Sequence, residues 1–156
     1  MNSIFKKEIH TEIGIDASPD AVWDVLVDLV SYPDWNPMVK KAGGEVRVGE
    51  RLRLHYEPEG HRKRTFNPLL LVVEPGRELR WRGQPGMRFL FESEHIYILK
   101  ETPEGNTHLD HDMIFYGLII PAVRHFIEKA TRKPFNDLNR AMKDRVEGLG
   151  PSRPAM

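Results

Sequence analysis

Apolar and polar residues alternate with a period of two in some stretches of this chain and recur every three or four residues in others. A period of two predicts a strand with one buried face, and the longer period predicts an amphipathic helix. Residues 8–15 show the first pattern, which places Ile9, Ile13 and Ile15 on one face. The first predicted element is therefore a strand with an isoleucine face toward a core.

The helical pattern follows directly. Ser18 is a favourable N-cap, and Pro19 suits the first helical position because no backbone N–H is needed there. Apolar residues then recur at helical spacing. Pro33 and Pro37 end this helix and leave room for at most one short helical turn around Trp35.

From residue 38 to residue 117 the period of two returns, interrupted by turn residues. The interruptions are Gly43-Gly44, Val48-Gly49-Glu50, Pro58-Glu59-Gly60, Pro75-Gly76, Pro85-Gly86 and Pro103-Glu104-Gly105. In such turns proline presets the dihedral angle of the first corner residue and glycine takes the positive one. Because short turns join antiparallel neighbours, we predict an antiparallel meander whose longest strands occupy about residues 87–101 and 106–117.

Residues 119–147 change to helical spacing and predict a long amphipathic helix. At ~1.5 Å per residue it would be roughly 40 Å long, which is enough to cross the whole sheet. Pro134 lies inside it and is expected to kink it, because its ring displaces the carbonyl four residues back. We therefore predict one domain over residues 1–147 and a flexible tail over residues 148–156.

The composition argues against several classes of protein. Among 156 residues, 23 basic and 23 acidic side chains give a formal net charge of zero, so no electrostatic argument favours nucleic acid as a partner. Cysteine is absent, which excludes disulfides, thiolate nucleophiles and cysteine-ligated zinc. No apolar run approaches the ~20 residues of a membrane span, and no secretory signal is evident. We expect a cytoplasmic location without stable membrane insertion.

His95 is the titratable residue of greatest interest, because the alternation places it on the inward face of a strand among apolar and aromatic side chains. An imidazole there suits a general base or a group that orients a ligand carbonyl. The alternative is a structural core histidine that hydrogen-bonds to Tyr97, His111 or Trp35.

A second histidine, His111, is predicted on the same face of the next strand. With no third ligand evident there, the pair does not predict a metal site, and no cofactor is expected. His108, Asp110 and Asp112 point the other way and also have ligand-like chemistry. Alternate polar positions on a half-exposed strand are usually only solvated, which is how we interpret them.

The remaining candidates are apolar or aromatic side chains directed toward a hollow between the sheet and the last helix. Aromatic rings can stack on a ligand and tyrosine hydroxyls can orient it, although core packing is the alternative for the tryptophans. The candidate ligand-binding residues are Trp35, Leu54, Tyr56, Trp81, Phe91, His95, Tyr97, Leu109, His111, Met113, Phe115 and Phe126.

The order and spacing of several short segments form a further pattern, which spans about residues 8–147. The segments are Ala17-Ser18-Pro19-Asp20-Ala21-Val22-Trp23, Asp28, Tyr32-Pro33-Asp34-Trp35-Asn36-Pro37, Glu74-Pro75-Gly76-Arg77-Glu78-Leu79-Arg80-Trp81-Arg82-Gly83, Glu94-His95, Phe115-Tyr116-Gly117-Leu118 and Phe135-Asn136-Asp137-Leu138-Asn139. Together they resemble the START/polyketide-cyclase (SRPBCC) superfamily, in particular its polyketide cyclase/dehydrase-like branch.

The resemblance implies an α+β helix-grip fold: a curved seven-stranded antiparallel sheet around a long C-terminal helix, in the order β-α-α-β6-α, with an apolar cavity between them. Two residues depart from the family pattern. Such sequences often carry an inward glutamate where this chain has Met113, and they usually lack a proline at the position of Pro134. The first departure argues against a polar pair in the cavity, and the second is expected to reshape or gate its mouth.

Three functions fit these features. The favoured one is binding of a small hydrophobic molecule (a lipid, a quinone or a polyketide-like compound) in an internal cavity, by a monomer or homodimer. The resemblance and the inward His95 together also suggest a cyclase/dehydratase-type enzyme acting on a bound polycarbonyl chain, with His95 as its catalytic residue and a tyrosine hydroxyl helping to stabilise an enolate. The third is a ligand-responsive regulatory or interaction module, in which loops near Gly60 and Gly86 or the bend at Pro134 move.

Overall fold

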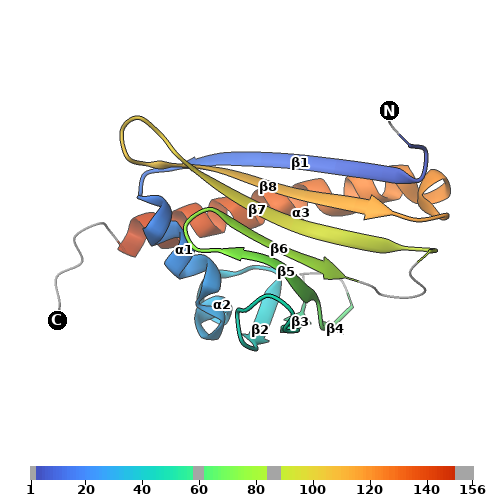
Figure 1. The fold of residues 1–156 in the computed structure, drawn as a ribbon, viewed down its shortest axis with the longest axis horizontal. Helices are drawn as coiled ribbons and strands as arrows, with labels where there is room; N and C mark the ends of the chain where they lie inside the picture. The colour runs from blue at the N-terminus through green and yellow to red at the C-terminus, as the bar shows by residue number, and fades with distance from the viewer. Residues whose placement is uncertain (1–2, 58–61, 84–88, 150–156) are drawn as a thin grey trace.

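The computed structural model describes residues 3–57, 62–83 and 89–149. Its elements, in chain order, are β1 (Lys6–Ile15), α1 (Pro19–Val27), the 3-10 helix η1 (Leu29–Ser31), α2 (Tyr32–Trp35), β2 (Val39–Gly43), β3 (Arg53–Tyr56), β4 (Arg64–Phe66), β5 (Leu69–Glu74), β6 (Glu78–Gly83), β7 (Glu92–Glu101), β8 (Thr107–Tyr116) and α3 (Ile120–Leu149). The architecture is α+β, with antiparallel sheets and a long C-terminal helix, as expected for a helix-grip fold (Figure 1).

The strands form two sheets, and the prediction of a single seven-stranded sheet is wrong. Five strands pair in the order β1-β8-β7-β6-β5, and three pair in the order β2-β3-β4. The break falls between β4 and β5, where Pro68 has no backbone N–H to donate to a ladder. The two sheets stay joined there by an isolated bridge from Arg51 to Leu69 and by a 3.0 Å hydrogen bond from Leu52 N to the Pro68 carbonyl.

The segment between β1 and β2 follows its sequence signals. Ser18 Oγ accepts a hydrogen bond from Ala21 N at 3.2 Å, which confirms the predicted N-cap of α1. The predicted short helical turn around Trp35 is present as α2, which ends at Trp35. The first helix ends earlier than the prolines predict, because α1 stops at Val27, η1 follows it, and Pro33 lies in the first turn of α2.

The last helix, α3, runs along the five-stranded sheet and packs on β1 and β8 (Figure 1). It is continuous through Pro134. Gly148 and Leu149, which the sequence pattern assigns to the tail, belong to this helix. The other predicted tail residues, 150–156, lie outside the described residues, as do the turns predicted at 58–60 and 85–86.

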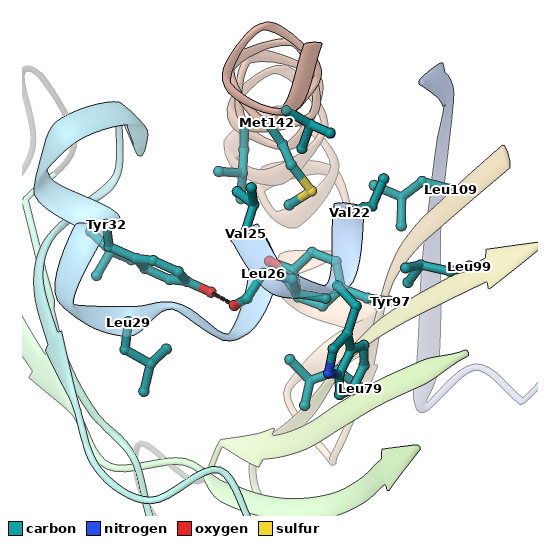
Figure 2. Packing of buried hydrophobic residues seen from close by; sticks show 14 of the residues in the cluster. Val22, Val25, Leu26, Leu29, Tyr32, Leu79, Tyr97, Leu99, Leu109 and Met142 are labelled. Atoms are coloured by element: carbon teal, nitrogen blue, oxygen red, sulfur yellow. Dashed lines mark hydrogen bonds between the residues drawn. The ribbon is translucent and has the colours of Figure 1, made fainter. Parts of the chain in front are cut away.

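Among the described residues, the core consists of two buried clusters. The larger one joins α1 to the sheet and to the C-terminal half of α3; Figure 2 shows Val22 and Leu26 of α1 near Met142 of α3 and Leu99 of β7. The smaller cluster lies near the start of α3 and comprises Ile9, Phe115, Ile120 and Ile127. No helix in the described part of the chain is long and apolar enough to cross a membrane.

Candidate ligand-binding cavity

A mostly apolar cavity of about 280 Å³ lies between the sheets and α3, and residues of both core clusters line it. Its volume lies just below the range of roughly 300–1,000 Å³ that is typical of small-molecule sites. Phe126 and Ala130 of α3 and Arg64 of β4 line it and are exposed, so they mark the side on which the cavity opens to solvent.

Nine of the twelve candidate ligand-binding residues line this cavity. They are Leu54, Tyr56, Trp81, Phe91, His95, Tyr97, Met113, Phe115 and Phe126. The sheet positions follow from strand alternation, because inward residues at every second position of β7 and β8 share one face.

Trp35, Leu109 and His111 do not line the cavity, which corrects our expectation for them. Trp35 packs edge-on against Tyr32, with ring centroids 5.3 Å apart, and borders a second hollow beside α1. Leu109 is fully buried in the larger core cluster. His111 is also fully buried, and its ring stacks on Tyr97 and Phe135, which do line the cavity.

Several lining residues were missing from the sequence prediction. They include Tyr32, Asn36, Phe66, Ser93, Ile127, Thr131, Phe135 and Leu138. The α3 residues among them lie at intervals of three or four, so helical spacing applied over the whole segment would have found them. Ser93 continues the inward series of β7 that contains His95. Asn36 Oδ1 accepts hydrogen bonds from Met38 N and Val39 N at 2.8 and 2.9 Å, so it shapes the turn after α2.

The central polar feature is a chain of hydrogen bonds that starts in β1 and ends at His95. Thr11 Oγ1 lies 2.6 Å from the His111 carbonyl, and Asn139 Nδ2 lies 2.9 Å from Thr11 Oγ1. Asn139 Oδ1 is 2.6 Å from His111 Nδ1, and His111 Nε2 is 2.6 Å from His95 Nε2. Three strands and α3 each contribute a residue to this chain, which we call the histidine relay.

The direction of each hydrogen bond in the histidine relay follows from its first member. A carbonyl can only accept, so the Thr11 hydroxyl donates to it and has only lone pairs left for Asn139. The Asn139 amide group therefore donates to Thr11, and its oxygen accepts from His111 Nδ1–H. In neutral His111 the other nitrogen, Nε2, is then an acceptor, and His95 Nε2–H must be the donor.

Aromatic rings enclose the two imidazoles. The His111 ring is stacked between Tyr97, at 4.3 Å and 11°, and Phe135, at 4.1 Å and 7°. The His95 ring stacks on Phe135 at 4.9 Å and lies 4.7 Å from Trp81. The apolar surroundings disfavour a charged imidazole: burial lowers the pKa of His111 to about 3 and holds that of His95 well below its ordinary value. Both histidines are neutral at pH 7.

The outward residues of β1 and β8 form a separate polar cluster on the opposite face of the sheet. His10 Nδ1 lies 2.5 Å from Asp112 Oδ1, and His10 Nε2 lies 2.9 Å from Glu12 Oε2. In the same cluster Asp110 forms an ion pair with Lys100, with 2.8 Å between Oδ2 and Nζ. The hydrogen bonds to Glu12 and Asp112 raise the pKa of His10. Our interpretation of Asp110 and Asp112 as merely solvated therefore missed a network of ion pairs.

Comparison with known proteins agrees with this architecture. Residues 6–147 match the family described as "Polyketide cyclase / dehydrase and lipid transport". The chain belongs to this family. No curated protein matches it significantly. The resemblance noted in the sequence is thereby confirmed.

Solved structures of the same fold include members of the START superfamily. A START superfamily protein from Mycobacterium smegmatis superimposes with a TM-score of 0.74 at 22% identity, covering 91% of this chain and 98% of that one. The Zhui aromatase/cyclase from Streptomyces sp. R1128 superimposes with a TM-score of 0.78 at 17% identity, covering 97% of this chain and 99% of that one. A norcoclaurine synthase mutant from Thalictrum flavum, bound to a transition-state analogue, superimposes with a TM-score of 0.71 at 17% identity. The match covers 92% of this chain and 95% of that one. At these identities the similarity establishes the fold.

Proposed function

We propose that this protein binds a small hydrophobic molecule in the cavity between its sheets and α3. The observation that carries the proposal is a hollow of about 280 Å³ whose wall is mostly aromatic and aliphatic. Closely packed protein interiors have few voids larger than a water molecule, whereas this cavity is far larger than the roughly 10–15 Å³ that one water requires. An apolar space of this size favours an organic guest.

The family supports this function, since its description joins cyclases and dehydrases with lipid transport. Lipids, quinones and polyketide-like compounds remain the candidate ligands. Aromatic side chains such as Trp81 and Phe91 provide flat apolar surfaces, and the polar groups of His95 and Tyr56 would fix the orientation of a guest.

Native mass spectrometry and solvent extraction of gently purified protein test the proposal. We expect a carried organic molecule, and we expect Ala130→Trp to lose it, because residue 130 is exposed at the cavity opening. Ala122→Trp is the matched control, since Ala122 is exposed on the same helix but does not line the cavity. The proposal fails if wild-type protein carries nothing and also binds no two-ring aromatic probe, or if both variants keep the molecule equally.

A second candidate function is a cyclase/dehydratase-type reaction on a bound polycarbonyl chain, which His95 specifically favours. It lines the cavity, it is neutral, and its hydrogen bond to His111 would stabilise the imidazolium formed if it accepted a proton from the substrate. His95→Ala should then abolish turnover while a ligand still binds. Unchanged turnover on a confirmed substrate would remove His95 from the mechanism. Of the loops invoked for a regulatory module, Gly60 and Gly86 lie outside the described residues.

A further inference from the structure

We infer that the ligand of this cavity presents a hydroxyl hydrogen-bond donor, a phenol or an enol, to Nδ1 of His95. The inference rests on the proposed binding function and names the chemical class of its ligand. It differs from the expectation that His95 would orient a ligand carbonyl.

The argument begins with the proton that His95 already uses. The histidine relay, read from Thr11 through Asn139 and His111, requires His95 to donate from Nε2. A neutral imidazole carries one N–H, so Nδ1 holds a lone pair and can only accept. His95 therefore offers the cavity an acceptor and no donor.

The second step concerns what surrounds Nδ1. No hydrogen bond engages it within the described part of the chain, and it is not among the buried side-chain atoms that lack a partner there. His95 itself is partly exposed and lines the cavity. The atom therefore borders open space, where a bound molecule can reach it.

The third step concerns the charges that face this position. Among the described residues that line the cavity, none is Asp or Glu, and the exposed Arg64 is the basic residue at the opening. Arg64 lies over the rings of Tyr56 and Phe66, at 5.4 and 5.2 Å from their centroids. With no carboxylate among the described lining residues to stabilise an imidazolium, His95 stays neutral and its acceptor character persists when the cavity is filled.

These steps predict discrimination between ligands of the same shape. A carbonyl or ether oxygen placed against Nδ1 brings two acceptors together and leaves the buried nitrogen unpaired, whereas a hydroxyl completes the relay. A site built to hydrogen-bond a substrate hydroxyl rejects the analogue that lacks it far more strongly than an apolar pocket rejects a missing methylene.

The test compares 2-naphthol with 2-methoxynaphthalene by calorimetry. For wild-type protein we expect the naphthol to bind at least about tenfold more tightly, although the ether is the more hydrophobic molecule. His95→Phe keeps an aromatic ring among its stacking partners and removes the acceptor, so it should bind the two probes with similar affinity. His125→Phe, at an exposed position of α3 outside the cavity, should keep the wild-type preference.

The outcomes separate the two proposals. If neither probe binds wild-type protein, the inference fails; if that protein also carries no organic molecule, the proposed binding function fails with it. If both bind wild-type protein equally, or if the preference survives in His95→Phe, the inference fails while the binding function stands. A second measurement needs no variant: long-range ¹H–¹⁵N correlations should show His95 protonated on Nε2 and His111 on Nδ1. Protonation of His95 on Nδ1 would overturn the inference.

Discussion

The burial of His111 predicts a specific loss of stability in acid. Its imidazole is fully buried, stacked between two aromatic rings, and already donates its single proton to Asn139. A second proton on His111 would place a cation there and force Nε2 to stop accepting from His95. The unfolded chain has no such restriction, so acid favours unfolding through this residue.

The magnitude follows from the two pKa values. The pKa of His111 falls from 6.5 to about 3 on folding because burial disfavours the charged form. The unfolded state therefore binds more protons than the folded state between these values, and stability falls as the pH drops through this window. Linkage gives a loss of about 2 kcal/mol between pH 7 and pH 5. This loss of stability is nearly the same for any folded-state pKa of His111 below about 4, because at pH 5 the loss depends almost entirely on protonation of the unfolded chain.

The assay is urea unfolding at pH 7 and pH 5 of wild-type protein and of His111→Gln, which keeps a polar side chain and removes the titration. We expect the free energy of unfolding of the wild type to fall by about 2 kcal/mol more than that of the variant. His125→Gln, at an exposed position of α3, should behave as the wild type. Equal losses in wild type and His111→Gln would refute the assignment of a buried, neutral His111.

Three further outcomes are expected. Gly117→Ala should destabilise the fold by several kcal/mol in thermal unfolding, because the φ of Gly117 is 140° and an added Cβ would lie 2.0 Å from the Leu90 carbonyl oxygen. Gly14→Ala is the control: the space around an added Cβ is open there, so stability should change little. Ser18→Ala removes the cap of α1 and should cost about 1 kcal/mol in urea unfolding; no change would show that the cap is dispensable. Hydrogen bonds to Glu12 and Asp112 raise the pKa of His10. Wild-type protein should therefore be more stable than His10→Gln below about pH 6 and should lose that advantage as the pH rises to 9. An advantage that grows with pH would contradict this sign.

Strand alternation correctly assigned inward faces in β6, β7 and β8, because it places each side chain on one face, but it could not show that Leu109 and His111 lie in the core beyond the cavity. His95 and Tyr97 show this: strand alternation makes both inward-facing, and both line the cavity. Trp35 shows where the reasoning fails. It lies at the end of α2, outside any extended periodic segment, so no pattern fixed the direction of its side chain.

The predicted single sheet failed for a related reason. Turn signals identify where strands end, but they do not say whether pairing continues from one strand to the next. Pro68 can interrupt a strand ladder and is evident in the sequence. Only the three-dimensional arrangement shows that the strand pairing at this point is reduced to a single bridge between Arg51 and Leu69.

The amino-acid pattern alone determined the order of elements: the first strand, the helix capped by Ser18, the antiparallel meander and the closing helix. Those features depend on residues within a few positions of one another, through local sterics, capping and periodicity. The tertiary structure decided the histidine relay and the cavity beside it. Asn139 meets Thr11 across 128 positions and His111 across 28, so their contacts require the rotation of α3 and the pairing of β1 with β8 to be fixed first. Local sequence carries no record of which groups such packing brings together.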